Sequence, residues 1–176
     1  AYGWHPEKVV ANALFADGAA AVVASANPSP VHQSLALRRS GSMVIPKSAD
    51  LMHWEIGDHG FAMGLSPLVP EKVGAALLPW LRDWLNDVDI ELEAVTSWAV
   101  HPGGPKILST CAEVLSLEPN RLLDSRAVLQ DHGNMSSATI LFILERLRRR
   151  ERSGPCLALA FGPGLSAEVA LFDRKY

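Results

Sequence analysis

The stretch Trp98-Ala99-Val100-His101-Pro102-Gly103-Gly104-Pro105 carries the clearest structural signal in this chain. It completes residues 95–100, which predict a short buried strand, and its prolines and glycines predict a turn that leads into a helix. The helical spacing then continues at Ile107, Leu108, Cys111, Val114 and Leu115, so Cys111 is expected to pack in a core. A strand, a turn and a helix in this order are typical of layered α/β folds.

Two further helices are expected on either side of this unit. Pro70 opens a helical pattern with an inward apolar face, and Pro79 should kink or break that helix. The face consists of Val73, Leu77, Leu81, Trp84 and Leu85. Residues 135–147 are apolar on nearly every side, which predicts a buried central helix, and the charged residues 146–152 after it are typical of a solvated helix end.

Strands are expected in three parts of the chain. Small apolar residues after the Asp17-Gly18 break predict a buried strand at about residues 20–25, followed by a loop at Asn27-Pro28-Ser29-Pro30. Residues 35–65 predict an antiparallel section, with strand-like pieces separated by Gly41, Gly57 and Gly60. Two last strands are expected at about residues 156–161 and 167–172. The order of elements predicts one layered α/β domain over residues 1–176.

The composition of the 176 residues excludes several classes of protein. A hydrophobic share of 48% suffices for one substantial core, and a net charge of -3 gives no reason to expect nucleic acid or an anionic membrane as a partner. No signal peptide or membrane-spanning run is recognisable, so a cytoplasmic location is expected. The two cysteines, Cys111 and Cys156, lack metal-site spacing, and His53, Asp58 and His59 match no strong zinc motif, so no metal is expected.

His101 and Asn134 are the candidate catalytic residues. Each lies on a glycine-bearing loop, and an imidazole with a carboxamide can together bind the negative charge that develops on a carbonyl oxygen. Gly103 and Gly104 allow close backbone approach to a ligand and place N–H groups at a helix start, where anions bind well. Other interpretations stay open: a histidine can satisfy a buried turn, and Asn134 stands where a helix N-cap is expected.

Four passages in this order resemble the chalcone and stilbene synthase family, the type III polyketide synthases, especially its bacterial members. They are Ala13-Leu14-Phe15-Ala16-Asp17-Gly18-Ala19-Ala20-Ala21, His101-Pro102-Gly103-Gly104-Pro105, Gly133-Asn134-Met135-Ser136-Ser137-Ala138 and Phe161-Gly162-Pro163-Gly164-Leu165. The resemblance implies that the chain is the C-terminal half of a thiolase-like fold. It also implies that the missing nucleophile is a cysteine in an N-terminal half, which completes a Cys-His-Asn set with His101 and Asn134.

The resemblance further implies an acyltransferase that condenses malonyl-coenzyme A, with loss of carbon dioxide, onto an acyl-coenzyme A starter. It implies that Phe15 and Met63 gate or shape the substrate cavity and that Ser136 lines it. Lys106, Gly103 and Gly104 are candidates for the coenzyme A entrance, where a cation suits phosphate, and a solvated surface lysine is the alternative interpretation of Lys106. No tightly bound cofactor is expected, and the complete protein should be a homodimer. Two alternatives remain: a ketoacyl synthase III-like condensing enzyme, and a non-catalytic folding or dimerisation module.

Overall fold

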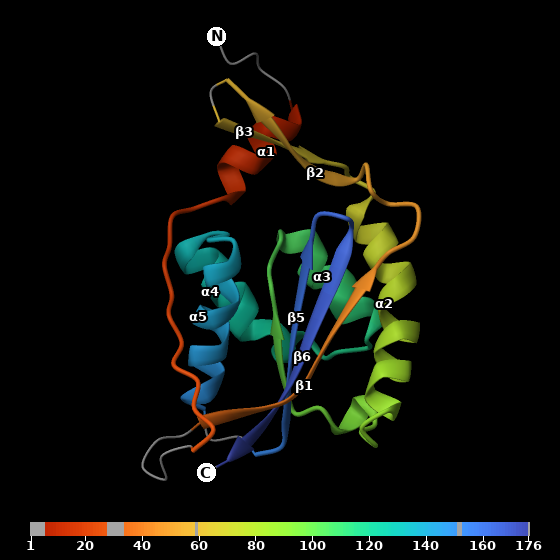
Figure 1. Cartoon of the computed structure of the whole chain (residues 1–176), viewed down its shortest axis with the longest axis vertical. Helices are drawn as coiled ribbons and strands as arrows, with labels where there is room; N and C mark the ends of the chain where they lie inside the picture. Colours follow the sequence, from red (N-terminus) through yellow and green to blue (C-terminus); the bar gives the residue numbers. More distant parts are fainter. Residues whose placement is uncertain (1–5, 28–33, 59, 151–152, 176) are drawn as a thin grey trace.

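A four-stranded mixed sheet separates two layers of helices (Figure 1). The computed structural model describes residues 6–27, 34–58, 60–150 and 153–175. The elements are α1 (Pro6–Leu14), β1 (Ser34–Val44), β2 (Met52–Gly57), β3 (Gly60–Leu65), α2 (Val69–Asn86), β4 (Ser97–Val100), α3 (Pro105–Val114), α4 (Leu123–His132), α5 (Ser137–Arg148), β5 (Pro155–Gly162) and β6 (Ser166–Lys175). Two short 3₁₀ helices, η1 (Leu92–Ala94) and η2 (Pro119–Leu122), complete them. Pro28 to Pro30 of the predicted loop, His59 and residues 151–152 lie outside the described residues.

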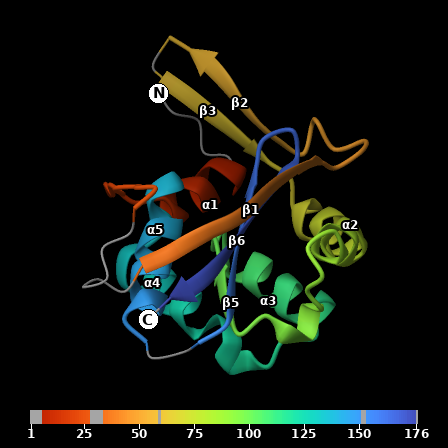
Figure 2. The ribbon, with the colours of Figure 1, turned by 60° about the horizontal axis from the view of Figure 1, so that its bottom comes forward.

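The strands of the main sheet lie in the order β1-β6-β5-β4. β4 pairs with β5 in parallel, whereas β5 with β6 and β6 with β1 pair antiparallel. β2 and β3 form a separate antiparallel hairpin that stands away from the sheet next to α1 (Figure 2). The predicted α/β class is confirmed, and the predicted antiparallel section divides between this hairpin and a strand of the main sheet.

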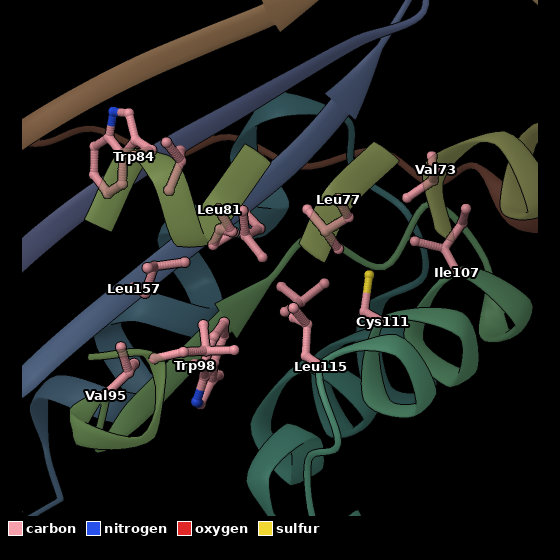
Figure 3. Packing of buried hydrophobic residues seen from close by; sticks show 14 of the residues in the cluster. Val73, Leu77, Leu81, Trp84, Val95, Trp98, Ile107, Cys111, Leu115 and Leu157 are labelled. Atoms are coloured by element: carbon pink, nitrogen blue, oxygen red, sulfur yellow. The ribbon is translucent and has the colours of Figure 1, made fainter. Parts of the chain in front are cut away.

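The larger core lies between the sheet and the helices α2 and α3 (Figure 3). The predicted apolar face of α2 is buried there as expected, and so is Cys111 on α3. Trp98 and Leu157 cover the same core from the sheet. The prediction for Pro79 is wrong in one respect, because α2 continues through this proline instead of breaking at it.

The second layer consists of α4 and α5, on the opposite face of the sheet (Figure 1). Alternate residues of the strands, such as Ala99 and Ala158, pack here against Ile143 and Leu147 of α5. The helix is not buried on every side as predicted. Its residues Leu141, Phe142 and Leu144 are only partly covered, although both the sheet and α4 pack against α5.

Two strand predictions are also wrong. Gly41 lies inside β1 and does not separate strand pieces; a Cβ at Gly41 would lie 2.2 Å from Nε1 of Trp84, so the close approach of α2 explains this glycine. Residues 16–25 form no strand in the structure, and all of them are exposed. Within the described residues, they pair with no strand of the sheet.

Candidate active site

His101 directly follows the last residue of β4. Its backbone N–H donates to the carbonyl oxygen of Leu159 at 2.8 Å, and its own carbonyl accepts from the N–H of Gly103 at 3.0 Å. These bonds hold the histidine between the end of the sheet and the start of α3 at Pro105. Burial lowers the pKa of His101 from its ordinary value of 6.5 to about 4. The imidazole is therefore neutral at pH 7 and can donate one N–H to a ligand.

Asn134 lies between α4 and α5 and is 3% exposed. Its side-chain Oδ1 accepts the backbone N–H of Ser136 at 2.9 Å. Since only the oxygen of the amide accepts a hydrogen bond, this contact fixes which way the carboxamide points and leaves Nδ2 as a donor. The N-cap prediction is wrong: α5 begins at Ser137, two residues later than expected, and Ser136 occupies the N-cap position.

Leu14 connects the two glycine-bearing loops. Its carbonyl oxygen accepts the N–H of Asn134 at 2.9 Å. Its side-chain Cδ2 lies 3.7 Å from the position that a Cβ on Gly104 would take. The turn after His101 and the loop that carries Asn134 therefore meet at the same residue, although 33 positions separate the two candidates in the sequence.

The loop before α5 has an unusual backbone. Gly133 has a φ of 72°, and a Cβ at this position would lie 2.9 Å from the Cβ of Ala16. Ser136 has φ 55° and ψ -133°, a conformation that residues with a side chain rarely adopt. The hydrogen bond from its N–H to Asn134 holds it there, and its exposed side chain lies beside the candidate site. Strain of this kind is concentrated at functional sites.

Phe15 and Met63 are linked through Trp54. Met63 is the cross-strand partner of Trp54 in the β2–β3 hairpin, so both side chains lie on one face of it. The rings of Phe15 and Trp54 lie 6.3 Å apart between centroids, as do those of Trp54 and Phe61. This hairpin face is apolar throughout and consists of Met52, Trp54, Ile56, Phe61, Met63 and Leu65. The sequence interpretation missed Trp54 and Phe61, although the alternation of apolar residues along both strands would have indicated them.

Lys106 and the two glycines lie at the start of α3. Lys106 is exposed, and Gly103 and Gly104 are partly covered. α3 begins with Pro105, so the first donors of the helix follow the glycine turn directly. The charge of Lys106 and the N-terminal end of a helix both favour an anion in this place.

The cysteines offer no nucleophile. Cys111 and Cys156 are both 0% exposed in the cores on the two sides of the sheet. Burial raises the pKa of the Cys111 thiol to about 12, which suppresses the reactive thiolate. The described residues also contain no group of three His, Cys, Asp or Glu side chains that could hold a metal ion.

A cavity of about 290 Å³ lies at the other end of β4. It is lined by residues that include Leu92, Trp98, Leu117 and Glu118, and it shares none with the His101 and Asn134 loops. The indole Nε1 of Trp98 is buried, and within the described residues it has no hydrogen-bond partner. The candidate site is therefore separate from this cavity.

Comparison with known proteins supports the sequence resemblance. The family described as "Chalcone and stilbene synthases, C-terminal domain" matches residues 36–174. Type III polyketide synthase 21 from Oryza sativa subsp. japonica is 35% identical over 173 residues, which are 94% of this chain and 44% of the rice protein.

The crystal structure of PKS-I from the brown alga Ectocarpus siliculosus superposes with a TM-score of 0.84 at 25% identity. The superposed region covers 97% of this chain and 48% of the algal chain, and this similarity confirms the expected thiolase-like fold. This chain thus spans less than half the length of either relative. Within the described residues, no helix has the length and apolar character needed to cross a membrane. On the match over residues 36–174, the chain belongs to the chalcone and stilbene synthase family and carries its C-terminal domain.

Proposed function

We propose that this chain supplies the histidine and the asparagine of a Cys-His-Asn condensing site in a type III polyketide synthase. The observation that carries the proposal is the meeting of the two loops at Leu14, which brings the turn after His101 to the loop of Asn134. The reactive cysteine comes from the part of the synthase that this chain does not contain. The isolated chain is expected to be inactive, since both of its own cysteines are buried.

In the proposed reaction, the cysteine thiolate takes an acyl group from a starter coenzyme A thioester, and the coenzyme A thiol leaves. Malonyl-coenzyme A then loses carbon dioxide: the bond to its carboxylate breaks, and the electron pair of that bond forms an enolate on the thioester. The neutral His101 and the Nδ2 of Asn134 donate hydrogen bonds to the enolate oxygen, which lowers the energy of this step. The enolate carbon attacks the acyl group, a carbon–carbon bond forms, and the cysteine leaves as thiolate.

The same proposal gives roles to the neighbouring residues. Phe15, Met63 and Trp54 form an apolar wall that suits an acyl chain, and Ser136 contributes a hydroxyl at the rim. Lys106 and the backbone at Gly103 and Gly104 face the phosphates of coenzyme A, which is bound as a thioester substrate and not as a resident cofactor. The complete protein is proposed to be a cytoplasmic homodimer.

Two alternatives need separate tests. A ketoacyl synthase III-like enzyme would use the same two donors but would take malonyl groups from a carrier protein. A non-catalytic folding or dimerisation module would explain why the described cysteines are buried.

The test uses the enzyme completed with a cysteine-bearing N-terminal half. We expect His101→Ala and Asn134→Ala each to lower malonyl-coenzyme A decarboxylation about 100-fold or more, the usual effect of removing one oxyanion donor. His132→Ala is the matched control, since His132 is exposed at the end of α4. Unchanged activity in the first two variants would refute their roles. Faster turnover with malonyl carrier protein than with malonyl-coenzyme A would favour the ketoacyl synthase alternative.

A further inference from the structure

The outer edge of β4 is bound by side chains from one short segment, which consists of η2 and the start of α4. Within the described residues β4 pairs with β5 alone, so its other edge has no neighbouring strand. Just before β4, the carbonyl oxygen of Val95 accepts a hydrogen bond from Arg121 of η2. At the end of β4, the backbone N–H of Val100 donates to Oγ of Ser125 at 3.1 Å. The segment therefore occupies the position of a neighbouring strand.

The hydrogen bond between Val100 and Ser125 lies directly before His101. Consecutive N–H groups of a strand point to opposite sides: that of His101 donates to Leu159 of β5, and that of Val100 points to the outer edge. Val100 and Ser125 are both 0% exposed, so bulk water does not reach this bond. A buried N–H without a partner is costly, and the hydroxyl of Ser125 therefore fixes the last residue of β4 in its place.

Helix α4 extends this contact to Asn134. Ser125 lies in the first turn of α4. At the other end of the helix, the N–H of Gly133 still donates to Leu129 at 3.0 Å, so helical hydrogen bonds continue up to the residue before Asn134. The side chain of Ser125 thus binds the strand that leads to His101, while its helix leads to Asn134. One buried hydrogen bond therefore connects the supports of the two candidate donors.

Ion pairs hold the start of α4 against α5. Asp124 directly precedes Ser125, and its side chain is 6% exposed. Its Oδ1 accepts a hydrogen bond from Nη2 of Arg150 at 2.8 Å and lies 3.5 Å from Nε of Arg146 on α5. Because this carboxylate is buried and meets two guanidinium groups, it fixes the first turn of α4 better than a single exposed ion pair would. The hydroxyl of Ser125 therefore lies on an anchored helix.

From these contacts we propose that Ser125 is a positioning residue of the candidate active site: its hydroxyl holds the end of β4 and thereby sets the place of His101 relative to Asn134. The inference rests on the proposed function, in which both residues donate to one enolate oxygen. Two donors stabilise the same oxygen only when both lie within hydrogen-bond distance of it, so a shift of about 1 Å at His101 would cost much of the stabilisation. Ser125 itself touches no substrate and acts through Val100.

A matched pair of variants tests the hydroxyl in the enzyme completed with a cysteine-bearing N-terminal half. Valine and threonine have nearly the same shape, but only threonine carries an oxygen that can accept the N–H of Val100. We expect Ser125→Val to lower kcat for malonyl-coenzyme A decarboxylation about 10-fold relative to Ser125→Thr, with KM unchanged. The amides of Val100 and His101 should exchange with deuterium about 10-fold faster in the same comparison. If the added methyl group prevents folding, Ser125→Ala and the parent enzyme make the comparison without it.

Thr96→Val is the control for a merely structural effect. Oγ1 of Thr96 donates to the carbonyl oxygen of Pro155 at 3.0 Å, at the opposite end of β4 from His101. The loss of this bond should lower the melting temperature, as the loss of the Ser125 hydroxyl does, but it should leave kcat unchanged. Equal falls of kcat in Thr96→Val and Ser125→Val would give Ser125 a structural role only and would overturn the inference.

The His101→Ala variant separates this inference from the proposed function. When His101→Ala is inactive, equal kcat values in Ser125→Val and Ser125→Thr overturn the inference and leave the proposed function standing. When His101→Ala is fully active, the proposed function fails, and amide exchange alone decides. Faster exchange in Ser125→Val then keeps Ser125 as the residue that holds the end of β4, and equal exchange in the two variants rejects that role as well.

Discussion

Asn134 and Phe15 form a parallel β-bridge. Asn134 donates its N–H to Leu14 and accepts the N–H of Ala16, each at 2.9 Å. The bridge therefore connects Asn134, the candidate oxyanion donor, to Phe15, whose ring lies against Trp54 of the β2–β3 hairpin. A displacement of the segment around Phe15 must therefore move Asn134 as well. This coupling makes the loop before α5 the most informative place for mutation.

Ser136→Gly should stabilise the isolated chain by about 1 kcal/mol, because glycine adopts the φ of 55° without strain. Chemical denaturation measures the change. Ser137→Gly is the matched control: Ser137 begins α5, and a glycine there should stabilise nothing and cost up to about 1 kcal/mol. If Ser136 also contacts substrate, the stabilised variant loses activity in the completed enzyme. A Ser136→Gly protein that is less stable than the parent would contradict the strain argument.

Gly133→Ala should destabilise the chain by about 2–3 kcal/mol, because it combines a positive φ with a Cβ that would lie 2.9 Å from Ala16. Adding Ala16→Gly removes the clash but leaves the backbone strain, so the double variant should recover part of the loss. Urea unfolding of the four proteins measures this coupling. Strictly additive effects would show that the loop shifts and avoids Ala16.

The stability of the chain should depend on the protonation of His101. The pKa is about 4 in the folded state and near 6.5 when the chain is unfolded, so the unfolded state binds more protons between these values. The free energy of unfolding is therefore expected to fall as the pH is lowered from 6.5 to 4, by up to roughly 3 kcal/mol. His101→Gln should flatten this part of the pH profile, which chemical denaturation at several pH values measures. An unchanged slope in His101→Gln would locate the effect elsewhere.

Trp54→Ala should widen the proposed acyl site, because the indole lies against Phe15 and is the cross-strand partner of Met63. In the completed enzyme, we expect a lower KM for long acyl-coenzyme A starters and little change for short ones. Val44→Ala is a suitable control, since Val44 is an exposed apolar residue at the end of β1. A uniform loss of kcat for all starters would show instead that Trp54 only supports the hairpin.

The sequence by itself determined the family and those helices and strands that have a strong hydrophobic periodicity. The apolar face of α2, the strand before His101 and the helix with Cys111 follow from local periodicity, which needs no partner to be recognised. The motifs around His101 and Asn134 identified the chalcone and stilbene synthases, which the match over residues 36–174 confirms. The catalytic roles of these two residues stay predictions.

Only the tertiary structure decided what depends on contacts between distant segments. Three features arise from contacts between distant segments: the meeting of two loops at Leu14, the positive φ of Ser136 directly before α5, and the place of Trp54 beside Phe15. The same reason explains the incorrect strand at residues 20–25. Its small apolar residues favour burial, but a strand forms only where another strand accepts its hydrogen bonds, and within the described residues this segment pairs with none.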